Sequence, residues 1–289
     1  MKKIIACILC AALLCTALAV FVSAAAKPTK FLVLGDSIAA GSGVMTDRER
    51  FAYAWIVADA KGWELTNYGA GGDCSFDLLR KVKEDKNIRQ AIREADVINV
   101  SIGGNNLLHA EDFYGLIYEG LLGDYSQLEP IHEIIRDDFY NTIPVIRKLN
   151  PDALLVVQTL YNPVFPILPQ SLYKAYGEAV RGINASIYDY LDENPGAYVV
   201  ADVYGEFLRR YGTMFFDMTH PSFIGHAVIA QVLLDTIDGT ETAQPTLFDA
   251  AAGLGISWLL PYIRYVDRVL VAALRVISPV WPAINSLIS

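Results

Sequence analysis

Short apolar runs that lack polar alternation constrain the fold of this chain most strongly. Phe31–Leu34 is fully apolar, and four further candidate strands span residues 63–67, 97–102, 153–160 and 198–203. Strands without polar alternation are buried on both faces, as in a parallel sheet that is covered by helices. The sequence therefore predicts a five-stranded parallel sheet.

Segments with helical periodicity separate the candidate strands. Apolar residues recur at helical spacing over residues 131–149, 172–191 and 224–233. Repeated strand-then-helix order predicts an open, doubly wound α/β domain, here over residues 27–240. Ligands of such domains bind beyond the carboxyl ends of the strands, where the chain direction reverses. Chemistry is therefore expected at that edge of the sheet.

Residues 1–26 have the three parts of a secretory signal. Lys2 and Lys3 are followed by an uncharged apolar run, Ile4–Val22, and by the small residues Ser23–Ala26. The apolar run is nearly long enough to span a bilayer, so an uncleaved anchor is the alternative. In both cases the body of the protein is expected to be exported, to an extracellular or cell-envelope location.

The C-terminal segment, residues 241–289, differs from the rest in composition. Trp258–Ile277 is apolar nearly all round. The exceptions form a narrow polar stripe of Arg264, Asp267, Arg268 and Arg275. This pattern predicts an amphipathic helical extension with one wet edge. Three interpretations stay open: a cover near the active edge, contact of residues 257–289 with a membrane surface, and a partner-binding element.

The charge and the cysteines exclude several classes of protein. A formal net charge of −9 leaves no basic stripe for phosphates, which argues against nucleic-acid binding. Of the four cysteines, Cys7, Cys10 and Cys15 fall in the signal-like segment, so Cys74 has no partner for an intramolecular disulfide. No cysteine and histidine cluster in the sequence fits a structural zinc site. Cys74 is expected to be a packing residue, because the motif order places no base for it.

The first two candidate strands are each followed by a short motif. Gly35-Asp36-Ser37 would present a serine hydroxyl at the active edge of the sheet, at the start of a helix. The alternative is an ordinary turn and helix cap. The second loop contains Gly69, Gly71 and Gly72, whose backbone can approach a ligand closely. Its spacing is not that of a dinucleotide fingerprint, and a plain flexible loop is the alternative.

Two more motifs follow later strands. Asn105 comes after the third strand, where an uncharged amide can donate to an oxyanion, or where an asparagine-rich turn can form. Asp217 lies three residues ahead of His220, so that its carboxylate can fix the imidazole tautomer and leave Nε2 free to deprotonate a hydroxyl. A buried, hydrogen-bonded histidine is the alternative. Taken together, the four motifs supply a nucleophile, a base, an orienting carboxylate and oxyanion donors, which is a constellation for acyl transfer.

In their order, these motifs resemble the sequence blocks of the SGNH (GDSL) hydrolase family, and the resemblance covers nearly all of residues 31–226. It implies a flavodoxin-like three-layer α/β/α domain and a serine esterase or lipase-type activity that needs no metal or organic cofactor. By the family pattern Ser37 is the nucleophile, and Asp217 and His220 complete the triad. The implied oxyanion donors are the N–H of Gly72, the amide of Asn105 and the N–H of Ser37.

The family pattern also concerns residues next to these. Asp36 would take a supporting position beside the nucleophile. Many members carry an aspartate where this chain has Asn106, a change that removes a nearby charge but leaves the amide donor itself. Gly69 and Gly71 lie within reach of the same loop as Gly72.

The expected function is therefore that of an exported serine hydrolase acting on a carboxylic ester. Lipid esters, short-chain acyl esters and O-acetyl groups on glycans all stay open as substrates, because this fold serves many. A non-catalytic binding or scaffold protein, attached to the cell surface by its apolar tail, is the alternative. Acyl transfer to an alcohol or sugar would use the same residues.

Overall fold

The computed structural model describes residues 27–44, 47–164, 169–209 and 219–240. The predicted signal segment, the predicted C-terminal extension and Asp217 lie outside these described residues. Within the described part of the chain, no helix is both long and apolar enough to cross a membrane.

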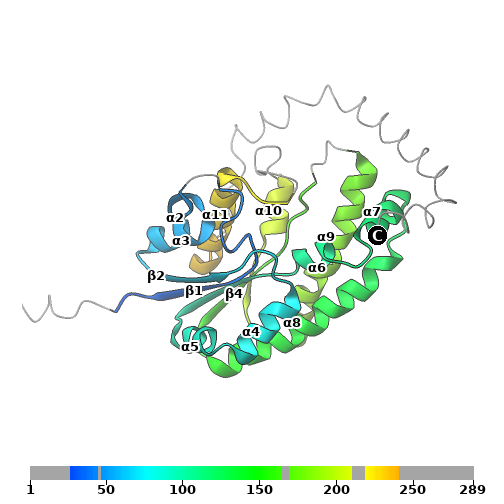
Figure 1. The fold of residues 1–289 in the computed structure, drawn as a ribbon. Helices are drawn as coiled ribbons and strands as arrows, with labels where there is room; N and C mark the ends of the chain where they lie inside the picture. Colours follow the sequence, from blue (N-terminus) through cyan, green and yellow to red (C-terminus); the bar gives the residue numbers. More distant parts are fainter. Residues whose placement is uncertain (1–26, 45–46, 165–168, 210–218, 241–289) are drawn as a thin grey trace, which may run out of the picture.

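Five parallel strands form one sheet, as the sequence predicts. They are β1 (Lys30–Gly35), β2 (Glu64–Gly69), β3 (Val97–Ser101), β4 (Leu154–Gln158) and β5 (Val199–Ala201). Their order is β2-β1-β3-β4-β5, with all neighbours parallel (Figure 1). The chain leaves β1 toward β2 on one side and later returns to β3 on the other. This order places the topological switch point, where ligands of such sheets bind, between β1 and β3.

Helices connect the strands. In the described residues they are α2 (Arg48–Phe51), α3 (Tyr53–Lys61), α4 (Ser75–Glu84), α5 (Lys86–Glu94), α6 (Gly104–Leu108), α7 (Phe113–Leu122), α8 (Glu129–Leu149), α9 (Gln170–Glu193), α10 (Val203–Arg209) and α11 (Phe223–Asp238), with a short 3-10 helix at Ser126–Leu128. The three helical patterns recognised in the sequence correspond to α8, α9 and α11.

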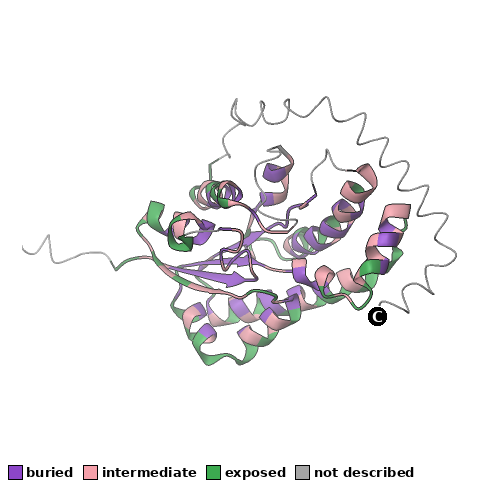
Figure 2. Ribbon diagram, turned by 45° about the horizontal axis from the view of Figure 1, so that its top comes forward, coloured by how far each residue is buried: buried purple, intermediate pink, exposed green. Residues whose placement is uncertain are grey.

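The core has two halves, one on each face of the sheet. In β1, Phe31 and Val33 point toward α3, α10 and α11, whereas Leu32 and Leu34 point toward α4, α5, α8 and α9. Strand β3 is buried throughout, and β1 is buried from Phe31 to Gly35 (Figure 2). Each such side chain contributes roughly 1.5–3 kcal/mol by leaving water. This arrangement confirms the predicted three-layer α/β/α fold.

A buried histidine ties α11 to the segment that follows β1. His226 is fully buried; its Nε2 is 2.8 Å from the carbonyl oxygen of Ser42, and its Nδ1 accepts from the N–H of Tyr53 at 3.4 Å. A carbonyl oxygen can only accept, so Nε2 carries the proton and the imidazole is neutral. Burial lowers the pKa of His226 to about 4, although the hydrogen bond to Ser42 opposes this shift.

His226 should therefore make stability depend on pH. Its pKa is about 4 in the folded protein against 6.5 for an unperturbed histidine, so the unfolded chain binds more protons between these pH values. The contribution of neutral His226 to the free energy of unfolding is fully present above pH 6.5. It falls by about 3 kcal/mol as the pH drops from 6.5 toward 4. In His226→Gln this loss disappears. The difference in unfolding free energy between wild type and variant, measured by urea titration, should shrink as the pH falls.

The pH dependence of the wild-type unfolding free energy would not by itself isolate the contribution of His226. Burial raises the pKa of Asp36 to about 7, so that residue favours the folded state at low pH, with the opposite sign. Asp36 is present in both proteins, and its contribution cancels in the difference. A difference that stays constant across this pH range would contradict the assignment of a neutral, buried His226.

Candidate active site

The first motif turns sharply at the carboxyl end of β1. Gly35 has φ +154°, and a Cβ atom on it would lie 2.1 Å from the carbonyl oxygen of Ser101 in β3. Only a residue without a side chain fits this close approach. The N–H of Asp36 donates to the same oxygen at 3.3 Å. Ser37 follows directly and therefore lies at the switch point of the sheet.

The prediction that Ser37 enters a helix is wrong. Residues 37–43 form successive turns, in which the N–H of Ser42 donates to the carbonyl of Ser37 at 2.9 Å. Gly41 and Gly43 have φ values of +82° and +95°, which a right-handed helix cannot contain. The turns leave the N–H of Ser37 without a protein acceptor among the described residues.

The structure brings the predicted base to the predicted nucleophile. His220 Nε2 lies 3.0 Å from Ser37 Oγ, although 183 positions separate the two residues in the chain. A hydroxyl and an imidazole in this contact form the nucleophile and base pair of covalent catalysis. Asp217 lies outside the described residues, so its predicted contact with His220 stays a prediction.

Two contacts fix the segment that carries His220. The hydroxyl of Tyr161, just beyond β4, donates to the carbonyl of Thr219 at 2.8 Å. Gly43 approaches so closely that a Cβ on it would lie 2.0 Å from the carbonyl oxygen of Pro221. His220 is thus held between the turn after β1 and the end of β4.

Asp36 lies beneath the nucleophile and is only 2% exposed. Its Oδ1 accepts from the N–H of Ile38 at 2.9 Å. Burial raises the pKa of this carboxyl to about 7, while the Ile38 N–H and the nearby His220 act to lower it. Asp36 therefore holds the turn around Ser37 from inside, consistent with the supporting position that the resemblance implies.

The carboxyl end of β2 packs directly against this turn. Gly69 donates its N–H to Asn67 Oδ1 at 2.8 Å, and the Asn67 amide donates to the carbonyl of Ala39 at 2.8 Å. A Cβ on Gly69 would lie 2.4 Å from the backbone nitrogen of Ala40. Because the N–H of Gly69 already donates to Asn67, Gly69 is not a candidate oxyanion donor. The role of Gly69, the last residue of β2, is close packing.

Gly71 and Gly72 keep N–H groups that reach no protein acceptor in the described part of the chain. Gly72 has φ +84°, and a Cβ on it would lie 3.7 Å from His109 Cε1. The same histidine lies near Cys74, with its Nδ1 3.5 Å from the sulfur. His109 is thus a neighbour of this cysteine that the motif order did not predict. Burial nevertheless raises the pKa of Cys74 to about 11, so the thiol is neutral and serves packing.

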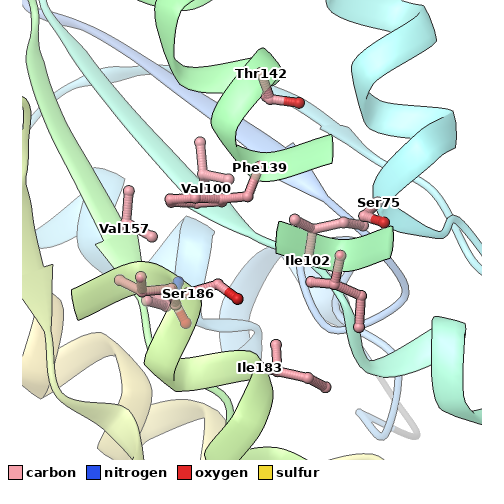
Figure 3. Close-up of a pocket in the computed structure, with 11 residues that line it drawn as sticks. Ser75, Val100, Ile102, Phe139, Thr142, Val157, Ile183 and Ser186 are labelled. Atoms are coloured by element: carbon pink, nitrogen blue, oxygen red, sulfur yellow. The ribbon is translucent and has the colours of Figure 1, made fainter. Parts of the chain in front are cut away.

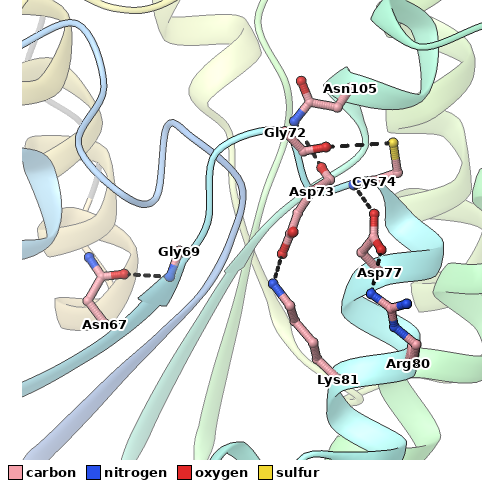
Figure 4. Close-up of polar contacts among 9 residues, drawn as sticks. All are labelled: Asn67, Gly69, Gly72, Asp73, Cys74, Asp77, Arg80, Lys81 and Asn105. Carbon is pink, nitrogen blue, oxygen red and sulfur yellow. Dashed lines mark hydrogen bonds and ion pairs between the residues drawn. The ribbon is translucent and has the colours of Figure 1, made fainter.

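Asn105, in α6, is 8% exposed and faces the loop after β2. Its Nδ2 donates to the carbonyl of Asp73 at 2.9 Å, which fixes the orientation of the amide (Figure 4). One of the two N–H bonds on Nδ2 is used in this way, and the second reaches no acceptor among the residues that the structure describes. Asp73 is itself held by an ion pair with Lys81.

An apolar cavity that is open to solvent lies beside Ser37, with a volume of about 640 Å³ including its open mouth. Its polar wall contains Asp36, Ser37 and Asn105. Its apolar wall includes Leu107, Leu108, Phe113, Leu160, Tyr161, Pro163, Tyr176, Val180 and Ile183. Sequence reasoning missed these lining residues. Only Leu160 and Tyr161 carried a signal, because they follow the carboxyl end of the fourth strand.

A second cavity lies on the α8 and α9 face of the sheet (Figure 3). It is a narrow space lined by the side chains of Ser75, Thr142, Gln158 and Ser186, but not by Ser37. It therefore belongs to the core rather than to the site. Among the described residues, no group of three or more histidine, cysteine, aspartate or glutamate side chains is placed to hold a metal ion.

Three solved structures share this fold. A lipase from a goat rumen metagenome has a TM-score of 0.59 and 20% identity, over 72% of this chain and 97% of that one. A phospholipase A1 from Streptomyces albidoflavus NA297 has a TM-score of 0.56 and 17% identity, over 73% of this chain and 100% of that one. An extracellular lipase from Streptomyces rimosus has a TM-score of 0.55 and 17% identity, over 72% and 99%. At these identities the likeness concerns the fold.

Sequence comparison gives the family. The uncharacterized protein YpmR of Bacillus subtilis (strain 168) is 33% identical over 139 residues, which are 45% of this chain and 50% of that protein. The match thus spans about half the length of this curated relative. A model of the GDSL-like Lipase/Acylhydrolase family matches residues 33–228, which is more than half of the chain and contains all four motifs. This protein therefore belongs to the GDSL-like lipase/acylhydrolase family.

Proposed function

We propose that this protein is an exported serine hydrolase that cleaves carboxylic esters of apolar acyl chains. The observation that carries the proposal is the 3.0 Å contact between Ser37 Oγ and His220 Nε2, beside an apolar cavity. Membership of a lipase and acylhydrolase family supports an ester substrate. So do the names of two solved relatives, a lipase and a phospholipase A1.

In the proposed mechanism, Ser37 attacks the ester carbonyl while His220, oriented by Asp217, takes the hydroxyl proton. The oxyanion accepts hydrogen bonds from the N–H groups of Ser37 and Gly72 and from the amide of Asn105. As the tetrahedral species collapses, the bond to the alcohol breaks and His220 gives its proton to the leaving oxygen. Water then attacks the acyl-enzyme with His220 as base, which releases the carboxylic acid and regenerates the Ser37 hydroxyl.

The cavity favours an acyl chain over an acetyl group or a sugar as the part of the substrate that it binds. Apart from the residues around Ser37, its wall is made mainly of aliphatic and aromatic side chains. A neighbouring apolar groove between α7 and α9, of about 400 Å³, shares Leu107, Phe113 and Tyr176 with it. The apolar lining therefore continues away from Ser37, in the direction that a longer chain would need.

Export is supported by the signal-like pattern of residues 1–26. A lipid ester would also suit contact of residues 257–289 with a membrane surface, since that segment is apolar with a charged stripe. We therefore include surface association as part of the proposal, with residues 27–240 as the hydrolase domain.

Asn105→Ala should lower kcat by about 10²–10³, with little change in KM, because an oxyanion donor acts mainly in the transition state. Ser37→Ala should abolish turnover. The measurement is hydrolysis of p-nitrophenyl butyrate by residues 27–289. Asn87→Ala, at an exposed position in α5, is the matched control and should behave as wild type. Unchanged kcat in Asn105→Ala would remove this residue from the oxyanion site.

Chain-length preference tests the acyl pocket. Wild type should prefer p-nitrophenyl octanoate to acetate in kcat/KM by at least about tenfold, since each buried methylene favours binding. Val180 is 5% exposed and lines the cavity, so Val180→Phe should narrow the cavity and reduce this preference. Val199→Phe adds the same ring at a 37% exposed position in β5 and should not. A preference for acetate that Val180→Phe leaves unchanged would favour an acetyl esterase instead.

A further inference from the structure

The segment that follows Gly72 is fixed residue by residue. The carbonyl of Asp73 accepts from the amide of Asn105 at 2.9 Å, and the N–H of Cys74 donates to Asp77 Oδ2 at 3.1 Å (Figure 4). This segment links two of the proposed oxyanion donors, because Gly72 precedes it and Asn105 binds it. Whatever holds the segment in place therefore sets the distance between the two donors.

Asn106 makes the next attachment. Its Oδ1 accepts from the N–H of Ser75 at 2.9 Å, and its Nδ2 donates to Ser75 Oγ at 2.8 Å. The hydroxyl of Ser75 in turn donates to Asp138 Oδ2 in α8 at 2.6 Å. Ser75 and Asn106 are 3% and 8% exposed, so water competes little for these contacts. The relay of Asn106, Ser75 and Asp138 connects α6, the start of α4 and α8.

The chemistry of the three side chains fixes which atom donates and which accepts in each hydrogen bond of this relay. The N–H of Ser75 needs an acceptor, which places the Asn106 oxygen there and its NH₂ group at the hydroxyl. The hydroxyl has one proton, and the Asp138 carboxylate can only accept it. With an aspartate at position 106, two carboxylates would face the Ser75 hydroxyl. Its single proton could be donated to only one of them. The asparagine at position 106 is thus matched to the carboxylate of Asp138.

We propose that Ser75 and Asp138 are positioning residues which, through Asn106, hold the Asn105 amide and the Gly72 N–H in register with Ser37. This inference rests on the proposed function, because it concerns donors to an oxyanion. None of the three relay residues touches the substrate in this proposal. The relay acts by fixing α6 and the loop after β2 to the same point on α8.

The test reverses the direction of the relay. In Asn106→Asp the carboxylate still accepts from the N–H of Ser75 but cannot donate to its hydroxyl. In Asp138→Asn the amide oxygen still accepts from Ser75, so this variant should be mild. In the double variant the hydroxyl of Ser75 donates to the new carboxylate at position 106, and the new amide at position 138 donates back to Oγ. All partners are then satisfied with the opposite polarity.

The expected result is a pattern in kcat for p-nitrophenyl butyrate. Asn106→Asp should lose about tenfold or more in kcat with little change in KM, because misplaced donors weaken transition-state binding. The double variant should recover most of this loss. Asn141→Asp, which adds the same charge at an exposed position of α8, should match wild type. Circular dichroism and the rate of Ser37 labelling by a fluorophosphonate accompany each measurement.

Two outcomes would overturn the relay while leaving the proposed function intact. In the first, the wild type is active and Asn106→Asp has the same kcat. In the second, the double variant has a kcat no higher than that of Asn106→Asp. If Asn106→Asp does not fold, Ser75→Ala takes its place. That variant should lower kcat, and adding Asp138→Asn to it should change nothing more; a further loss would contradict the relay. A wild type that neither hydrolyses esters nor reacts with the fluorophosphonate would instead overturn the proposed function, and the inference with it.

Discussion

The carboxyl ends of β1 and β3 approach each other so closely that a side chain on Gly35 would collide with the carbonyl of Ser101, at 2.1 Å. This approach makes the chain turn immediately after β1 and leaves Ser37 in the crevice at the switch point of the sheet. The carboxyl end of β2 then packs on the turn through Gly69, whose absent Cβ would lie 2.4 Å from Ala40. Gly35 and Gly69, at the ends of β1 and β2, thus allow the turn that carries Ser37 to pack closely against both neighbouring strands.

Hydrogen bonding at this edge separates groups that hold the structure from groups left for a ligand. The N–H groups of Asp36, Ile38 and Gly69 have protein acceptors, whereas those of Ser37 and Gly72 have none among the described residues. Ser37 lines the cavity, so its N–H is available to an acceptor bound there, whereas Gly72 is exposed and its N–H is open to water or to a ligand. The raised pKa of the buried Asp36 marks the low polarity of this region, in which such donors act more strongly on a developing charge.

The sequence predicted the sheet and its parallel strands, because unbroken apolar runs such as Phe31–Leu34 report burial on both faces directly. The three-layer fold was implied by the family resemblance. The sequence also identified Ser37 and His220, which the structure brings together, although their catalytic roles stay predictions. It did not predict the turns after Ser37, where two positive φ values override helix formation. Nor did it reveal the attachment of Ser75 to Asp138, because residues 63 positions apart meet only through the packing of α4 on α8.

If Ser37 is the nucleophile, it becomes acylated during turnover, and this intermediate can be trapped. The protein, from residue 27 onward, would be mixed with p-nitrophenyl octanoate and quenched in acid within its first turnovers, and its peptides would then be mapped by mass spectrometry. We expect an octanoyl adduct on the peptide that contains Ser37, and none in Ser37→Ala. An adduct on another residue, or ester hydrolysis by wild type that survives unchanged in Ser37→Ala, would contradict the assignment of Ser37 as the nucleophile.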